Sequence, residues 1–280
     1  MSLTGVAKAN LAIVEKGSYV APSGRLVPLR ELIDRSVTKT VLYRPDAYDA
    51  LYAALRPTAG SPRIEVTTET TAEASRRLVE AEHEKEVVAL NFASAKNPGG
   101  GYIRGAKAQE EDLARCSALY HCLVGHREYY DENRAHPSMC YLDYMMYSPE
   151  VPFFRDERYD LLEEPFLASI ITAPAPNAGE AAGRKEAADV PVVLRERARK
   201  VLWVAATHGH KNLVLGAWGC GVFRNDPREV AEAFALGLAD SALAGAFDRV
   251  VFAIWERNPE RPTKRAFDER FASAAPSGQA

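Results

Sequence analysis

The sequence predicts an α/β protein in which a mixed or mainly parallel β-sheet carries helices on its faces. Apolar runs alternate along the chain with amphipathic segments, and such alternation is typical of strands joined by helices. With 280 residues, of which 47% are hydrophobic and 26% charged, the chain can bury a core without disulfides or metals. No internal repeat divides it, so we expect one domain over residues 1–270.

The expected elements follow from the N-terminus in a regular order. Residues 1–60 form an extension that begins with a helix and continues into a hairpin over residues 17–29. The expected strands are residues 63–69, 87–94, 166–173, 212–218 and 249–255, and the expected helices are residues 70–84, 192–209 and the segment that follows Pro227. Residues 173–189 are predicted to be a mobile surface loop, and residues 271–280 a disordered tail.

Charge and composition exclude several classes of partner. The net charge of -3 and the pI near 6.1 argue against direct binding of nucleic acid, which needs basic stripes. No apolar run approaches the roughly 18 residues that would span a bilayer, so we expect no membrane partner. The four cysteines lack paired spacing and residues 1–10 show no apolar signal core, which favours a reducing, cytoplasmic location.

The first candidate site is a run of glycines directly after the strand at 87–94. The segment Asn97 to Gly101 reads NPGGG, and consecutive backbone N–H groups without side chains can surround an anion. Ligands of open α/β sheets bind beyond the carboxyl ends of strands. A plain flexible loop is the alternative, but we favour a binding loop.

Four polar residues, Gln109 to Asp112, begin the next predicted helix. Acids in a first helical turn commonly serve the helix dipole alone. Neighbouring helix positions point about 100° apart, so Glu110 and Glu111 cannot act as an opposed acid and base on one atom. We therefore expect one to hold substrate while the other performs proton chemistry, with burial or substrate phosphates raising a carboxyl pKa that the helix terminus lowers.

A second glycine loop, GAWGCGVFRNDP over residues 216–227, again joins a strand to a helix. Asp226 suits the N-cap and Pro227 the first helical position. Gly219 and Gly221 would let the backbone approach a diphosphate, and Phe223 could pack on a sugar or base. The loop departs from the G-x-G-x-x-G pattern, so we set dinucleotide oxidoreduction aside.

Other chemistry-bearing residues are better explained by structure. Cys116, His121, Cys122 and His126 lack the short paired spacing of zinc sites, and we expect core packing, no metal and no cofactor. The tyrosine-rich segment at 140–154 is expected to be half-buried sheet, because no basic residues accompany it. His208 and His210 flank Gly209 at a helix end, where a cationic side chain is favourable, and we interpret them as structural.

These motifs carry a family resemblance. Three glycines, seven intervening residues and then QEE, followed later by GAWGCGVF, resemble the signature of the bacterial-type poly(ADP-ribose) glycohydrolases over about residues 10–260. The resemblance implies a macrodomain-like fold, a mixed β-sheet sandwiched between helices, with ADP-ribose bound in a cleft. It implies that Glu111 is the catalytic acid, that Glu110 and Asn97 hold the hydroxyls of the cleaved ribose, and that Gly219 to Phe223 bind the diphosphate, with Phe223 bracing the distal ribose.

The full set of expected site residues combines both kinds of argument. Glu111 and Glu110 are the catalytic candidates, and the expected substrate-binding residues are Asn97, Gly99, Gly100, Gly101, Gln109, Gly216, Gly219, Cys220, Gly221, Val222 and Phe223.

The implied activity is mainly exo-acting hydrolysis of ribose–ribose bonds in poly(ADP-ribose), because a segment outside the sheet caps the terminal unit in this type. Implied partners are the polymer, ADP-ribose and ADP-ribosylated proteins, in the reversal of ADP-ribosylation that includes the DNA damage response. Two alternatives stay open: a non-catalytic ADP-ribose reader, and a hydrolase that removes single ADP-ribose units from modified side chains.

Overall fold

The structure, a computed structural model, describes residues 1–272. Within these residues, the main sheet contains seven strands in the order β3-β6-β7-β5-β8-β9-β4. The strands are β3 (Val41–Tyr43), β4 (Arg63–Thr67), β5 (Val87–Phe92), β6 (Met145–Arg155), β7 (Leu161–Ala173), β8 (Asn212–Leu215) and β9 (Arg249–Ala253). The five strands that follow one another in the sheet as β7, β5, β8, β9 and β4 pair in parallel. In contrast, β6 pairs antiparallel with both β7 and β3. The expected mixed sheet is therefore confirmed.

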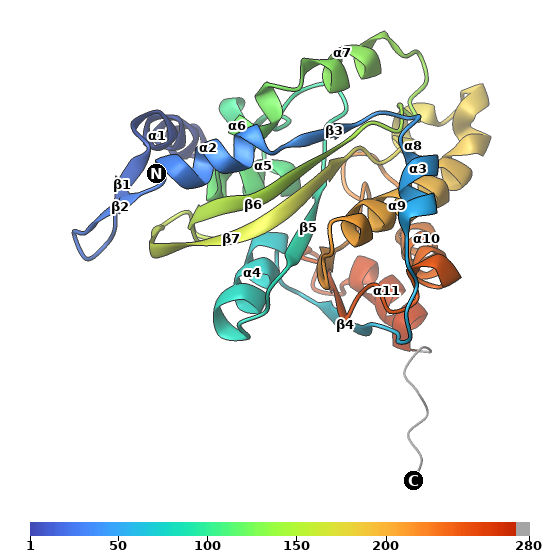
Figure 1. The fold of residues 1–280 in the computed structure, drawn as a ribbon. Coiled ribbons are helices and arrows are strands. Elements are labelled where there is room, and N and C mark those ends of the chain that lie inside the picture. Colours follow the sequence, from blue (N-terminus) through green and yellow to red (C-terminus); the bar gives the residue numbers. More distant parts are fainter. Residues whose placement is uncertain (273–280) are drawn as a thin grey trace.

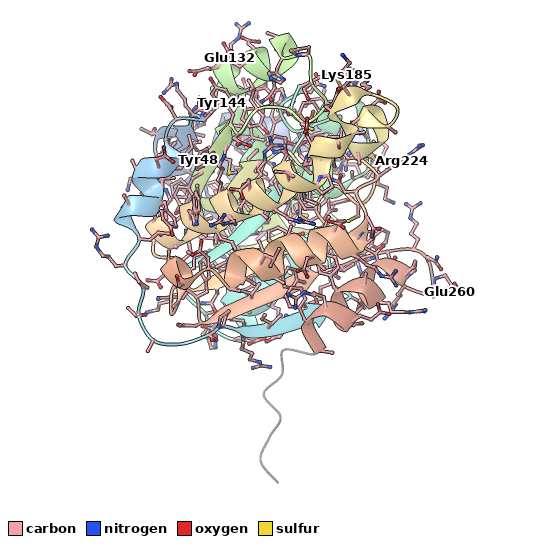
Figure 2. The ribbon with its side chains drawn as sticks, turned by 90° about the vertical axis from the view of Figure 1, so that its right-hand side faces the viewer. Tyr48, Glu132, Tyr144, Lys185, Arg224 and Glu260 are labelled. Carbon is pink, nitrogen blue, oxygen red and sulfur yellow. The ribbon has the colours of Figure 1, made fainter. Side chains whose placement is uncertain are left out.

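Helices cover both faces of this sheet (Figure 1). One face carries α9 (Val190–Thr207), α10 (Pro227–Leu238) and α11 (Pro262–Ala272), with α3 (Tyr48–Ala54) packed on α9; Figure 2 looks onto α9 and α10, which lie side by side. The other face carries α4 (Thr71–Arg76), α5 (Gln109–Cys116), α6 (Leu119–Val124) and α7 (Arg127–Ala135). The N-terminal part adds α1 (Leu3–Lys16), the hairpin β1 (Ser18–Val20) and β2 (Leu26–Pro28), and α2 (Arg30–Thr38).

The central strands alternate their side chains between two cores. On β5, Val88 and Leu90 pack toward α9 and α10, while Val87 and Ala89 pack toward α4 and α5. Successive side chains of a strand point to opposite faces, and all four are at most 4% exposed. Burial on both faces is expected for a parallel sheet covered by helices, and it fixes β5 as the rigid support of the loop that follows it.

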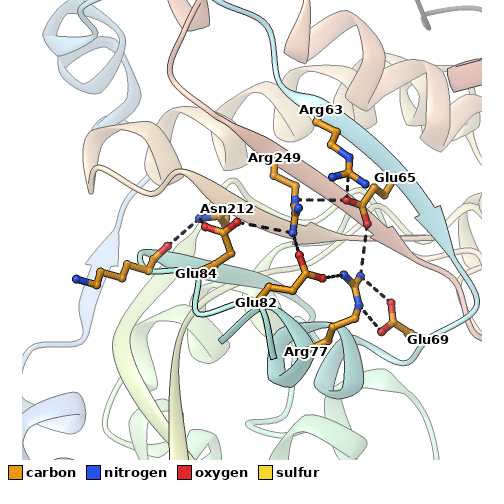
Figure 3. Close-up of polar contacts among 9 residues, drawn as sticks. Arg63, Glu65, Glu69, Arg77, Glu82, Glu84, Asn212 and Arg249 are labelled. Atoms are coloured by element: carbon orange, nitrogen blue, oxygen red, sulfur yellow. Dashed lines mark hydrogen bonds and ion pairs between the residues drawn. The ribbon is translucent and has the colours of Figure 1, made fainter. Parts of the chain in front are cut away.

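An ion-pair network ties the sheet edge to the end of α4 (Figure 3). Arg249 at the start of β9 contacts Glu65 on β4, at 3.3 Å, and also Glu82. Arg77 contacts Glu82 as well and bonds Glu69 at 2.7 Å. The sequence predicted one continuous helix over residues 70–84, but the chain widens into a π-helical turn at Arg77–Ala81, where Glu82 N bonds Arg77 O. At the start of this helix, Thr70 and Glu73 form a capping box.

Three other segments differ from the sequence-based expectation. The N-terminal extension is joined to the sheet through β3, which pairs with β6. Residues 173–189 contain α8 (Ala178–Ala181) and a 3-10 turn at Lys185–Asp189, and Gly179 N bonds Phe223 O at 2.9 Å. Residues 173–177 are buried, so the prediction of a surface loop was wrong for that part, whereas residues 182–189 are mostly exposed, as predicted. Phe271 and Ala272, assigned above to the tail, end α11, and residues 273–280 lie outside the described part.

The residues that we interpreted as structural occupy structural positions. Cys116 and Cys122 are buried in the core beneath α5 and α6, and the tyrosine-rich segment contributes β6. His208 bonds Tyr43 at 2.7 Å and His210 bonds Tyr147 at 2.8 Å. Burial lowers the pKa of His208 to about 4, so a cationic helix cap at this position was a wrong expectation.

Residues 1–272 contain neither a metal-binding cluster nor a membrane-spanning helix. No group of His, Cys, Asp or Glu side chains there is arranged to hold a metal ion, and none of the helices in that range has the length and apolarity to cross a membrane.

Candidate active site

Both glycine loops leave the same edge of the sheet. Because β7, β5 and β8 are neighbouring parallel strands, their carboxyl ends point the same way, where α/β sheets bind ligands. A Cβ atom added to Gly216 after β8 would lie 3.0 Å from the Phe92 ring at the end of β5, and one added to Gly219 would lie 2.7 Å from Ala175 after β7. The sheet therefore brings together the two loops that the sequence indicated.

The first loop is folded tightly against the start of α5. Gly99 and Gly100 have φ angles of 65° and 59°, a conformation that side chains disfavour. Gly100 N bonds Asn97 O at 3.0 Å, which closes the turn. A Cβ on Gly100 would lie 2.3 Å from Glu111 Oε1 and 3.0 Å from Glu110 Oε2. The missing side chain is what admits two carboxyl groups behind the loop.

Glu110 is buried on the sheet side of this loop. Its side chain accepts hydrogen bonds from Ser94 N at 2.7 Å and from Asn91 Nδ2 at 3.3 Å. Burial raises the pKa of Glu110 to about 8 and outweighs these bonds, which act in the opposite direction. At neutral pH the group is therefore mostly protonated, and it can donate a hydrogen bond to a ligand hydroxyl.

Glu111 is held at both carboxyl oxygens by backbone N–H groups. Gly101 N donates to Oε1 at 2.7 Å and Ala108 N donates to Oε2 at 2.8 Å. The residue is only 7% exposed. One loop, residues 101–108, thus supplies both donors and fixes the carboxyl plane beside the glycine run.

Gln109 uses its whole amide group for hydrogen bonds within the protein. Its Oε1 accepts from Phe92 N at 2.8 Å, and its Nε2 donates to Leu90 O at 2.8 Å and to Thr71 Oγ1 at 3.0 Å. These bonds fasten the start of α5 to β5 and α4. Gln109 therefore fixes the position of the helical turn that carries Glu110 and Glu111.

The second loop exposes a row of backbone donors. Among residues 1–272, we find no acceptor for the N–H groups of Gly221, Val222 and Phe223. The helix α10 begins directly afterwards, with Asp226 as its N-cap and Pro227 in its first turn, as the sequence predicted. Cys220 lies within this loop, and burial raises the pKa of its thiol to about 12, so the thiol is uncharged at neutral pH.

Aromatic and basic side chains connect the two loops. The Phe223 ring lies 5.9 Å from the ring of Tyr141, and Lys96 Nζ lies 5.9 Å from the same tyrosine ring. Lys96 belongs to the first loop and Phe223 to the second, so Tyr141 bridges them. Arg224 follows with a φ of 56° and points outward at the molecular edge in Figure 2.

The remaining predicted residues lie at the surface of the same region. Asn97 is exposed, and its side chain makes no hydrogen bond to any residue of the described part of the chain. Val222 is 80% exposed. Gly219 has a φ of 75°, and a Cβ there would lie 2.3 Å from Asn225 Nδ2. The structure thus places every predicted site residue on these two loops or on the first turn of α5.

Sequence reasoning missed three residues of the site. Asn91 interrupts the apolar strand β5, and this break in the pattern was an available signal. Lys96 and Tyr141 carried no such signal, since only the fold brings Tyr141, which follows α7, between the loops. The Asn91 Oδ1 atom is buried and has no partner among residues 1–272.

The end of the mixed sheet thus holds a glycine loop, the buried carboxyl group of Glu110 and the carboxyl group of Glu111, which backbone N–H groups hold at both oxygens. The family description "Microbial-type PARG, catalytic domain" matches residues 7–156, where PARG is poly(ADP-ribose) glycohydrolase. The chain belongs to this family of hydrolases.

Solved structures agree over nearly the whole chain. The poly(ADP-ribose) glycohydrolase of Thermomonospora curvata is 46% identical, with a TM-score of 0.91 over 96% of this chain and 99% of that one. The same enzyme bound to the inhibitor ADP-HPD gives a TM-score of 0.89 with the same identity and coverage. The Deinococcus radiodurans enzyme in complex with ADP-ribose is 46% identical, with a TM-score of 0.82 over 89% of this chain and 99% of that one. Among curated proteins, none matches the chain significantly.

The burial of Glu110 predicts a pH-dependent stability. The pKa of Glu110 is about 8 in the folded protein, above the ordinary value of 4.5, so its contribution to stability is fully present below about pH 4.5 and is lost as pH rises through 8. Glu110→Gln removes this loss. The variant's free energy of unfolding, relative to that of wild type, should therefore increase as pH rises from 5 to 8, by up to about 1.4 kcal/mol per pH unit.

Urea unfolding at pH 5, 6.5 and 8 measures this difference. The exposed Glu132→Gln serves as the control and should follow the wild-type curve. A constant offset between Glu110→Gln and wild type across this range would show that Glu110 ionises in the folded protein as it does in the unfolded chain.

Proposed function

We propose that the protein hydrolyses ribose–ribose O-glycosidic bonds in poly(ADP-ribose), mainly from the polymer end, and releases ADP-ribose, with Glu111 as the general acid and base. The observation that carries this proposal is the fixed carboxyl group of Glu111, which is held at both oxygens directly behind Gly100. Proton transfer needs a carboxyl group placed within hydrogen-bond reach of the reacting oxygen. The two backbone hydrogen bonds to Glu111 support such a placement.

Each step of the reaction has a group to support it. Glu111 begins protonated and gives its proton to the glycosidic oxygen as the bond breaks, so that the leaving ribose departs with a hydroxyl group; the carboxylate then takes a proton from the attacking water. Glu110, neutral at pH 7 because of its burial, and Asn97 hold the hydroxyls of the ribose being cleaved. The positive charge that develops on the sugar is stabilised by the diphosphate of the same ADP-ribose unit. This substrate charge takes the place of a second ionised carboxylate.

The second loop is suited to that diphosphate. The N–H groups of Gly221, Val222 and Phe223 lack acceptors within the described residues, and adjacent N–H groups form anion-binding concavities. Lys96 supplies a positive charge on the opposite side, over the ring of Tyr141. Phe223 would brace the distal ribose, and Gly99, Gly101, Gly216 and Gly219 would keep the backbone close to the ligand. Gln109 would hold α5 in place.

Two alternatives are outcomes of the same assay. A reader of ADP-ribose would bind the ligand and leave polymer intact, and a mono-ADP-ribosyl hydrolase would cut a modified protein but not polymer. Exo-acting cleavage releases ADP-ribose from the first time point, whereas internal cleavage releases oligomers first. Comparison of products from long polymer and from singly modified protein distinguishes all of these.

Glu111→Gln should abolish most turnover and spare binding. The lost proton donor acts in the transition state, so we expect kcat to fall by about 10²- to 10⁴-fold. The Kd for ADP-ribose should stay within about threefold, because proton donation contributes to the transition state and not to ground-state binding. Release of ADP-ribose from polymer and calorimetric titration measure the two quantities. Wild-type turnover by the variant would remove Glu111 from its role.

Gly221→Val should weaken ADP-ribose binding without destabilising the fold. A Cβ at Gly221 meets no atom within 4 Å, so the protein itself tolerates the side chain, whereas a diphosphate held by the loop would be crowded. We expect Kd to rise at least about tenfold, which corresponds to about 1.4 kcal/mol. Gly125→Val is the matched control, since its Cβ also meets nothing within 4 Å. Equal affinity in the two variants would place the diphosphate elsewhere.

A further inference from the structure

The carboxyl group of Glu111 depends on a loop that has little packing of its own. Loop 101–108 supplies both N–H donors to that carboxyl group. Five of its eight residues are exposed: Ile103, Arg104, Ala106, Lys107 and Ala108. An exposed loop with few buried contacts opens easily unless other groups hold it. The position of Glu111 therefore depends on whatever fastens this loop.

Arg115 is the first of these fastenings. It lies one helical turn after Glu111 on α5 and is 0% exposed, and its Nη2 donates to Ala106 O at 2.5 Å. The guanidinium lies 6.0 Å from the Tyr102 ring and 5.8 Å from the Tyr159 ring.

The burial of Arg115 is energetically unfavourable. Its Nε and Nη1 have no acceptor in the described chain, and no carboxylate forms a salt bridge with it there. Burial of an unpaired guanidinium is costly, and an apolar side chain would fill the same space at less cost. An apolar residue could not form the hydrogen bond to Ala106 O, so this bond to loop 101–108 is the feature that requires an arginine.

Helix α1 supplies the second fastening. Asn10, which is 1% exposed, donates from Nδ2 to Arg115 O at 2.7 Å and accepts at Oδ1 from Arg155 Nε, also at 2.7 Å. Tyr102, inside the loop, donates its hydroxyl to Ala7 O at 3.3 Å. Ala7, Tyr102 and Ala114 form a small cluster of their own. Helix α1, about 100 residues earlier in the chain, thus forms hydrogen bonds with both loop 101–108 and the helix that carries Glu111.

We propose that α1, acting through Asn10 and Tyr102, and Arg115 together position the carboxyl group of Glu111 for catalysis. None of these side chains needs to touch substrate. The proposal rests on the proposed function, because it assigns the catalytic role to Glu111. It explains why a helix outside the sheet packs against the glycine-rich side of the active site.

The test compares Asn10→Ala and Arg115→Met with matched variants. Asn212→Ala is the control for Asn10→Ala, because Asn212 is also buried and donates to a backbone carbonyl, Lys85 O at 2.8 Å, but lies at the opposite end of the sheet. We expect kcat to fall about 10- to 100-fold in both test variants, as is typical when a supporting group is lost. ADP-ribose affinity should stay within about threefold. Arg115→Lys, which keeps a donor, should recover part of the loss.

The rates of amide hydrogen exchange at Gly101 and Ala108 measure how stable the two hydrogen bonds to the Glu111 carboxyl group are, and no substrate is needed. We expect exchange at both amides to accelerate at least about tenfold in Asn10→Ala and Arg115→Met, and to be unchanged in Asn212→Ala. Tyr102→Phe, a milder change, should accelerate it less. This measurement needs only folded protein, so the Phe and Lys variants decide the matter where a harsher variant fails to fold.

Two results would overturn the proposal: unchanged exchange at Gly101 and Ala108, or a fall in kcat no larger than that of Asn212→Ala. A wild-type protein that released no ADP-ribose from polymer would instead contradict the proposed function. The exchange experiment would still show in that case whether α1 holds the loop.

Discussion

The site depends on one close approach, that of the Gly100 backbone to the two glutamates at the start of α5. No side chain fits at position 100, since a Cβ there would lie 2.3 Å from a carboxyl oxygen of Glu111. The approach lets Gly101 N reach that oxygen and leaves Glu110 buried deeply enough for its pKa to rise to about 8. Gly100 therefore lies against two adjacent carboxyl groups in different surroundings: burial raises the pKa of Glu110, whereas Glu111 accepts backbone hydrogen bonds at both oxygens.

The sheet makes this approach useful by placing a second loop opposite it. The parallel pairing of β5 with β7 and β8 sets three strand ends at one edge, and the loop after β8 presents backbone N–H groups with no acceptor inside residues 1–272. An anion drawn to those groups would bring its attached sugar toward α5. In the proposed mechanism, the fold would link the binding of a diphosphate to the placement of a carboxyl group, as a glycosidase with one proton-transfer group requires.

Local sequence signals predicted much of this arrangement. The glycine run, the Gln109 to Asp112 cluster and the 216–227 loop were each marked by residues that ordinary elements avoid or by helix-start chemistry, and the alternation of elements predicted the sheet. Contacts between distant segments left no such signal. The packing of residues 173–189 against Phe223 and the place of Tyr141 between the loops depend on tertiary contacts. Likewise, the neutral state of His208 follows from burial, and a cap pattern in the sequence does not reveal burial.

A ligand-bound crystal structure of this protein with ADP-ribose tests the central claim most directly. The account predicts that a carboxyl oxygen of Glu111 lies within hydrogen-bond distance, about 2.6–3.2 Å, of the hydroxyl on the anomeric carbon of the terminal ribose, while the diphosphate contacts the backbone of residues 219–223. A terminal ribose bound far from Glu111, or a diphosphate bound away from this second loop, would contradict it.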